Sequence, residues 1–386
     1  RKEKERPTIE MIHRKTSGGA QLLPQYVKIA WVSKGKFISC DSIFLNRTTA
    51  NLIPSELVTA RSVPLPNPDG TTYGIILPDK KILDSCFAFL ASNDDTRPET
   101  RASLWIMMYE NLLADSIHPE IFFRNLLHTL QIEKEPLLSS RLQKYLTRTY
   151  WQMLPSSVRE KYNRTVEHIL WTQMQRAEKE SKRTFFFSWL SVMESKEAME
   201  TCRQILEGSL VLPGFTPDEK DKNRIALELG LRDSAHWKSI LLKRIEECSN
   251  PDEKARMQFI LPALSPEIAE RDSYFASLSC PKNREHEPWV LTALSFLHHP
   301  LRQNTSVRYL HTSLEMLEKI RNTGDIFFPE RWLEATFSLY NSPEAVATVN
   351  EFLIRNPNYP SDLKAKILQQ TDMAFRAEHI IKHYFH

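Results

Sequence analysis

The chain has 386 residues, with 51 Lys or Arg and 48 Asp or Glu, so its formal net charge is +3. This length predicts two or three domains and excludes a single small module. A hydrophobic share of 41% excludes disorder as the main state, and the weak charge without a basic stripe argues against nucleic-acid binding. The most apolar run, Phe185–Met193, is far shorter than the roughly 20 residues of a membrane span, so we predict a soluble chain with no span.

The first residues and the cysteines indicate whether the chain is part of a longer protein and which redox environment it suits. The sequence begins with Arg1 in a run of mixed charges, which indicates a piece of a longer protein, and residues 1–7 are expected to be a loose tail. The five cysteines contain no Cys-x-x-Cys pair, which favours reduced, mostly buried thiols over disulfides or a Cys-based zinc site. The compartment stays open, and we favour the cytoplasm over the periplasm.

Strand signals fill the first 78 residues. Residues 26–32 alternate broadly between apolar and polar positions, Ser33–Lys36 can turn, and residues 37–45 return, which predicts a β-hairpin. A further candidate strand over residues 8–12 precedes this hairpin.

A second turn follows the hairpin at Asn67-Pro-Asp-Gly70, because its proline presets φ and its glycine accepts a positive φ. Residues 73–77 after it are expected to form another strand. We therefore predict a small antiparallel β-sandwich domain of five to seven strands over residues 1–78.

From about Lys80 onward the apolar pattern becomes helical. Three stripes recur at helical spacing, namely Leu104, Met108 and Leu112; Val166, Ile169, Leu170 and Met174; and Leu310, Leu314 and Leu317. Prolines at first-turn positions mark the joints, and about 15 helices follow one another without a strand pattern. We predict a mainly α chain whose residues 79–386 form a HEAT-like superhelical array. An irregular all-α domain without true repeats is the alternative.

The sequence lacks the motifs of several enzyme classes. Neither a Gly-x-Gly-x-x-Gly nor a P-loop motif occurs. The nearest match to the zinc-protease helix, His286-Glu-Pro-Trp-Val290, has valine at the second ligand position and a helix-breaking proline. We therefore expect no catalytic and no metal-binding residue in this chain.

Other histidines and aromatic residues have simpler explanations than a site. His379 and His383 are expected on a solvated helix face, and His298-His299 at a helix C-terminus whose dipole they complement. The cluster Phe185–Phe187 with Trp189 has no interleaved Lys or Arg and is expected to be core.

Ordered landmarks along the chain resemble the C-terminal part of zinc aminopeptidases typified by aminopeptidase N, and most closely the bacterial branch. The landmarks are Leu65-Pro-Asn-Pro-Asp-Gly-Thr-Thr-Tyr-Gly74, Arg101-Ala-Ser-Leu-Trp105, Tyr109-Glu-Asn111, Asn250-Pro-Asp-Glu-Lys254, Glu287-Pro-Trp-Val290, His299-Pro-Leu-Arg302, Gly324-Asp-Ile-Phe-Phe-Pro-Glu-Arg-Trp-Leu333 and Asn341-Ser-Pro-Glu-Ala345. The resemblance implies a β-sandwich followed by a helical array that arches over a peptide chamber and acts as its lid and walls.

The family's zinc-binding and substrate-anchoring motifs belong to a thermolysin-like catalytic domain and are absent here. The resemblance therefore implies that this chain is a non-catalytic portion of a larger enzyme and is inactive alone. Its partners are then the parent's own catalytic domain, which holds the zinc, and peptide substrates. The alternative is a free-standing HEAT-like scaffold that binds a protein partner.

Two arginines beside the landmarks are the candidate peptide-facing residues. Arg302 and Arg331 could meet the C-terminal carboxylate of a peptide, because the resemblance places the late helices at the chamber and a guanidinium binds a carboxylate bidentately. The simpler interpretation is that each arginine caps or salt-bridges neighbouring helices. Trp332, beside Arg331, is expected to be a buried anchor of a late helix pair.

Overall fold

The computed structural model describes residues 9–12, 24–33, 36–46, 49–52, 55–59, 61–92 and 97–386. The chain forms two compact units, Arg1–Tyr145 and Leu146–His386. The expected tail over residues 1–7 and the tip of the expected hairpin turn lie outside the described residues. No helix in the described ranges combines the length and the apolar character that a membrane span requires.

The first unit opens with short antiparallel strands, namely β1 (Ile9–Ile12), β2 (Gln25–Ser33), β3 (Lys36–Leu45), β4 (Thr49–Leu52) and β5 (Val63–Pro66). β1 pairs with β4, and a second sheet has the order β3-β2-β5. Alternate side chains of β2 and β3 pack into one small core with Val58, namely Val27, Ile29, Trp31, Ile43 and Leu45. The predicted hairpin and the antiparallel β class of this region are confirmed.

The predicted strand over residues 73–77 is wrong. These residues have no regular secondary structure, and Ile75 and Leu77 are exposed. The backbone N–H and carbonyl of Tyr73 bond the side-chain amide of Gln25, at 2.9 Å each, and not another strand. The edge of the sheet next to β2 is formed by β5, whose prolines an edge strand tolerates because one side of it needs no ladder hydrogen bonds.

The predicted Asn67–Gly70 turn forms, and it is tied to the first helices. Gly70 has φ +70°, and its N–H donates to the carbonyl of Asn67 at 3.2 Å. Ser103 donates its hydroxyl to the same carbonyl at 2.5 Å, and Asn111 donates to the carbonyl of Ile76 at 2.8 Å. The irregular segment that follows the turn is thus held by side chains of a helix.

Helices of the first unit are α1 (Lys80–Ala91), α2 (Pro98–Leu113) and α3 (Pro119–Leu130), and α4 (Pro136–Arg148) contains the division between the units. The predicted stripe of Leu104, Met108 and Leu112 is completely buried. Trp105 makes an edge contact with Phe122, with ring centroids 5.6 Å apart. This apolar face fixes α2 against α3.

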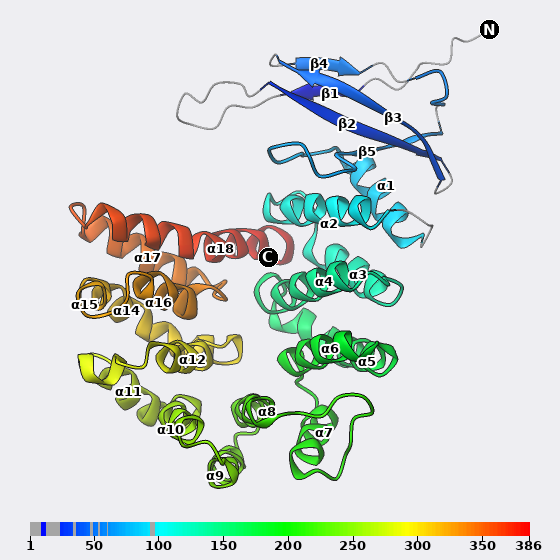
Figure 1. The fold of residues 1–386 in the computed structure, drawn as a ribbon. Helices are drawn as coiled ribbons and strands as arrows, with labels where there is room; N and C mark the ends of the chain where they lie inside the picture. The colour runs from blue at the N-terminus through cyan, green and yellow to red at the C-terminus, as the bar shows by residue number, and fades with distance from the viewer. Residues whose placement is uncertain are drawn as a thin grey trace. The chain divides into compact units, whose positions relative to one another are not determined.

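The second unit is an array of helices (Figure 1). It contains a π-helical turn η1 (Thr149–Met153) and the helices α5 (Ser156–Arg176), α6 (Lys179–Val192), α7 (Lys196–Glu207), α8 (Glu219–Arg232), α9 (Trp237–Glu247), α10 (Pro251–Ile260), α11 (Ile268–Ser277), α12 (Glu287–Leu297), α13 (Gln303–Ser306), α14 (Leu310–Glu315), α15 (Leu317–Thr323), α16 (Phe328–Phe337), α17 (Pro343–Arg355) and α18 (Ser361–Phe385). Short 3₁₀ turns occur at some joints, namely Leu261–Leu264, Pro281–Arg284, Pro300–Arg302 and Val307–Tyr309.

Successive helices of this unit pack against one another, so a core of buried side chains runs continuously from α8 to α18. Helix lengths range from 4 residues in α13 to 25 in α18, which explains why no single repeat length aligns the sequence. The predicted class, a small antiparallel β region followed by a helical array, is confirmed.

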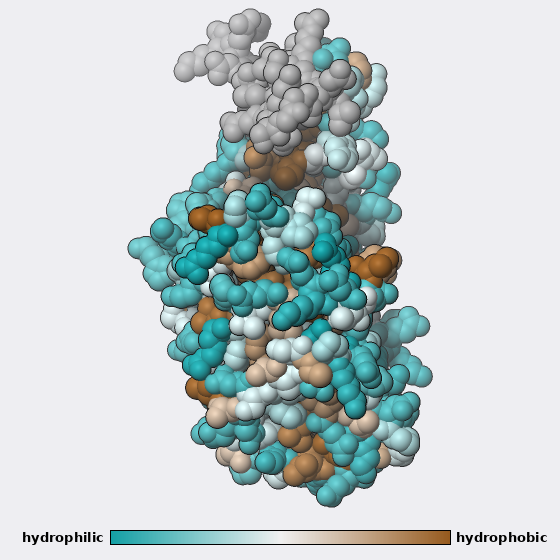
Figure 2. Space-filling view, turned by 90° about the vertical axis from the view of Figure 1, so that its left-hand side faces the viewer, coloured by the Kyte–Doolittle hydropathy of each residue, from teal (hydrophilic) through white to brown (hydrophobic). Residues whose placement is uncertain are grey.

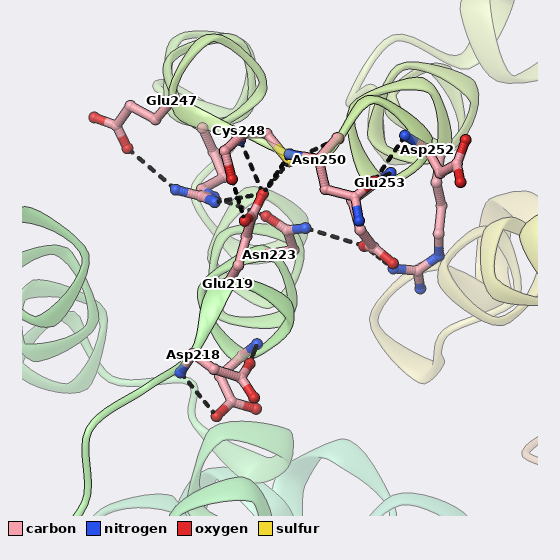
Figure 3. A network of polar contacts seen from close by, with 12 residues as sticks. Asp218, Glu219, Asn223, Glu247, Cys248, Asn250, Asp252 and Glu253 are labelled. Carbon is pink, nitrogen blue, oxygen red and sulfur yellow. Dashed lines mark hydrogen bonds and ion pairs between the residues drawn. The ribbon is translucent and has the colours of Figure 1, made fainter.

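Polar networks hold some of the joints. Figure 3 shows Glu219, at the start of α8, accepting hydrogen bonds from the joint between α9 and α10. Its carboxylate accepts from Cys248 Sγ at 2.7 Å, from Ser249 Oγ at 2.7 Å and from the backbone N–H groups of Ser249 and Asn250. The bond from Cys248, followed by those from Ser249 and Asn250, lowers the pKa of Glu219 to about 2. This carboxylate is therefore committed to a structural joint.

Candidate functional site

The guanidinium of Arg302 is engaged with the end of an earlier helical segment. Its Nη1 donates to the carbonyl of Ser265 and its Nη2 to the carbonyl of Leu264, both at 2.5 Å. Arg271 donates to Ser265 as well, at 2.6 Å. Burial, followed by the charge of Arg271, lowers the pKa of Arg302 to about 10. In the structure, Arg302 satisfies carbonyl groups that the end of a helical turn leaves without partners.

Several other basic groups lie near His299. Its Nδ1 accepts the N–H of Leu301 at 3.2 Å, and its ring meets Trp151 edge-on at 4.9 Å. Burial lowers the pKa of His299 well below its ordinary value, and nearby guanidinium groups lower it further, those of Arg232, Arg302 and Arg159. We call Arg159, Arg232, His299 and Arg302 the basic cluster.

Sequence reasoning singled out Arg302 and placed His299 at a helix end, but it missed the two other arginines of the basic cluster. Arg159 donates to the carbonyl of Leu154 at 2.8 Å and lies over the ring of Trp151 at 5.2 Å. Arg232 donates to the carbonyls of Met193 and Ser191, at 2.5 and 2.9 Å. Like Arg302, both arginines bond carbonyls near helix ends, so the cluster ties joints together. The available sequence signal was that Arg159 and Arg302 each follow a proline, Pro155 and Pro300, at the start of a helical segment.

Arg331 lies in a different environment from Arg302. It is an exposed residue of the first turn of α16, and its guanidinium lies over the ring of Phe327 at 5.8 Å. Phe327 and Ile326 are exposed to 51% and 75%. Of the two predicted arginines, Arg331 has the guanidinium that a ligand can reach without breaking a bond to a backbone carbonyl.

The family landmarks make contacts with one another. Glu287 accepts the N–H of Asp325 at 2.7 Å, which joins the start of α12 to the loop before α16. A Cβ on Gly324 would lie 2.6 Å from Phe328 and 2.9 Å from the Glu287 carboxylate, so a larger residue there would force these side chains to shift. In the first unit, Arg101 forms a bidentate pair with Glu133 at 2.7 and 2.8 Å. These landmarks are structural joints.

The remaining predictions on individual side chains have mixed outcomes. His298 does end α12, but burial lowers its pKa to about 3, so it is neutral and does not complement the helix dipole with a charge as predicted. Phe185, Phe186 and Trp189 are buried, as predicted, but Phe187 is half-buried and the guanidinium of Arg224 lies over its ring at 4.3 Å. The prediction of reduced, mostly buried thiols is confirmed: all five cysteines are free, and Cys86, Cys202 and Cys248 are buried.

A hollow of about 290 Å³ is lined by residues of α5, α6 and α7, among them Trp171 and Trp189. One of the lining carboxylates, that of Glu167, accepts from the N–H groups of Glu194 and Ser195 and from the Ser195 hydroxyl. At its rim, Arg164 pairs with Glu197 at 3.2 Å. Its charged groups are therefore engaged with neighbours.

Within the described ranges, no group of three or more His, Cys, Asp or Glu side chains is placed to hold a metal ion. His379 and His383 lie on α18 with ring centroids 6.5 Å apart. Figure 2 shows one face of the molecule, on which hydrophobic residues stand singly or in small groups among hydrophilic ones. The described residues considered above thus form helical joints and scattered surface groups.

Comparison with known families agrees with this architecture. Residues 64–374 match the model of the ERAP1-like C-terminal domain. The chain belongs to this family. The ERAP1-like C-terminal domain covers the end of the β region and nearly all of the helices, so it supports the resemblance to the C-terminal part of aminopeptidase N-like enzymes. No curated protein matches the chain.

Proposed function

We propose that this ERAP1-like C-terminal domain is the non-catalytic portion of a bacterial zinc aminopeptidase, which removes N-terminal residues from peptides. The observation that carries the proposal is the family match over residues 64–374. The ordered landmarks and the β region followed by a helical array support it. In this proposal, zinc and the water-activating chemistry belong to a thermolysin-like catalytic domain, which is the partner of this chain.

The chain's part in that enzyme is to form the lid and walls of the peptide chamber. Peptide selection then depends on side chains that face the chamber, and Arg302 and Arg331 are the candidates for the C-terminal carboxylate of the substrate. Because both terminal nitrogens of Arg302 already donate to carbonyls, we expect Arg331 to contribute more to carboxylate binding.

Kinetics of the full-length enzyme with paired substrates test this role. Arg331→Ala should raise KM for a free-acid peptide more than for the same peptide amidated at its C-terminus, by about tenfold for each 1.4 kcal/mol of lost binding. Arg355→Ala is the matched control, because Arg355 is an exposed arginine on α17 that pairs only weakly with Glu351, at 3.4 Å. Equal effects of Arg331→Ala on the two peptides would refute the carboxylate role.

The same substrates separate the two roles open to Arg302. A carboxylate contact predicts a selective rise in KM for the free acid in Arg302→Ala. A purely structural cap predicts a lower melting temperature and no difference between the two peptides, because the lost bonds to Leu264 and Ser265 are internal.

A further inference from the structure

The π-helical turn η1 is joined to a loop that lies far along the chain. Gln152 of η1 is completely buried, and its Nε2 donates to the carbonyls of Ser338 and Tyr340 at 2.8 and 3.3 Å. Asn341 in turn donates its Nδ2 to the backbone carbonyl of Gln152 at 2.9 Å. The side-chain oxygen of Gln152 accepts from Arg148 at 3.3 Å. Every polar group of this buried amide is therefore used.

Neighbouring contacts strengthen the same joint. The hydroxyl of Tyr340 lies 2.9 Å from His298 Nδ1, and Gln303 donates to the carbonyl of Leu339 at 2.5 Å. Three successive carbonyls of the loop between α16 and α17 thus receive amide donors from other elements. Trp151, next to Gln152, meets the ring of His299. The loop is held from two directions, by η1 and by the end of α12.

The sequence separation makes this joint unusual for a helical array. In a solenoid, each helical pair contacts only its neighbours along the chain. Here the bonded residues are 186 to 189 positions apart, and they lie near the start and near the end of the second unit. The array of the second unit is consequently closed on itself.

We propose that Gln152 and Asn341 form a clasp that closes the helical array of the second unit into a ring, and that the ring opens at this clasp while the helices stay folded. The hydrogen bonds that cross the clasp are amide-to-carbonyl bonds, which water replaces at small net cost when the partners separate. The contact of Trp151 with His299 and the packing of α18 on η1 must separate with them. Successive helices share a continuous apolar core in addition to the polar joints, and this core is lost only when the array unfolds. A π-helical turn is also a rare element that is frequent at functional sites.

Hydrogen exchange on the full chain, read peptide by peptide, tests the clasp. Gln152→Ala should raise amide exchange about tenfold to a hundredfold both in residues 149–153 and in residues 338–341, and Asn341→Ala should raise it in the same two segments. Asn356→Ala is the control, because the amide of Asn356 donates to Phe352 only one helical turn away. It should raise exchange only near its own position.

Two results would overturn the proposal. One is a rise confined to the mutated segment, since the two sides would then open independently. For the case in which a variant does not fold, the wild-type chain is measured in low urea. There, the two segments should become exchangeable together while α5 and α6 remain protected. Exchange of both segments only together with α5 and α6 would show that the clasp does not open by itself.

Discussion

Replacing Trp332 by alanine should destabilise the second unit by about 3–4 kcal/mol. Trp332 is completely buried, and its ring lies edge-on to Phe328 at 6.1 Å. A tryptophan of this kind buries about 200 Å² of surface, worth about 5 kcal/mol at about 25 cal/mol/Å². Its indole N–H is buried without a hydrogen-bond partner, which subtracts about 1–2 kcal/mol from that gain. Chemical denaturation followed by far-UV circular dichroism measures the loss.

Ile354→Ala supplies the control for this experiment. Ile354 is a large apolar residue of the same unit, but it is 77% exposed, so its truncation should change stability by less than about 0.5 kcal/mol. Trp332→Phe should lose less than Trp332→Ala, because phenylalanine keeps the ring and removes the unpaired N–H. A loss below about 1 kcal/mol for Trp332→Ala would refute the argument that this side chain anchors the late helices.

Two further predictions concern protons and metal. The folded-state pKa of His298, about 3, lies below its value of about 6.5 in an unfolded chain, so its contribution to stability is complete above pH 6.5 and is lost as the pH falls toward 3. Between pH 7 and pH 5, the free energy of unfolding measured by urea titration should fall by about 2 kcal/mol more in wild type than in His298→Gln. An identical fall in the two proteins would contradict the buried neutral state of His298. Metal analysis of the dialysed chain should find less than one zinc ion per molecule, and the chain alone should not cleave an aminoacyl chromogenic substrate. One tightly held zinc ion together with turnover would contradict the proposal that zinc and catalysis belong to a separate catalytic domain.

Local patterns predicted the hairpin and many helices because their information lies in neighbouring residues. The alternation in β2 and the buried stripe of α2 follow directly from strand and helix periods. Residues 73–77 have a similar pattern but are held by Gln25 and Asn111 from elsewhere in the chain. β5 carries two prolines and pairs through its remaining backbone groups, so its sequence argues against a strand.

The candidate site was harder to predict because it depends on distant contacts. The sequence indicated Arg302 through a landmark, but the carbonyls that it bonds belong to residues about 37 positions earlier. The neutral state of His298 arises from burial against other helices, which no local pattern encodes. The same holds for Gln152, whose partners lie at the other end of the unit.

The most direct test of the central claim is to read the sequence encoded immediately upstream of Arg1. The account predicts a His-Glu-x-x-His helix followed by a glutamate ligand, the motif that supplies zinc and a general base to a metallopeptidase. A start codon directly before Arg1, with no such motif, would contradict it and would leave the helical array as a free-standing scaffold.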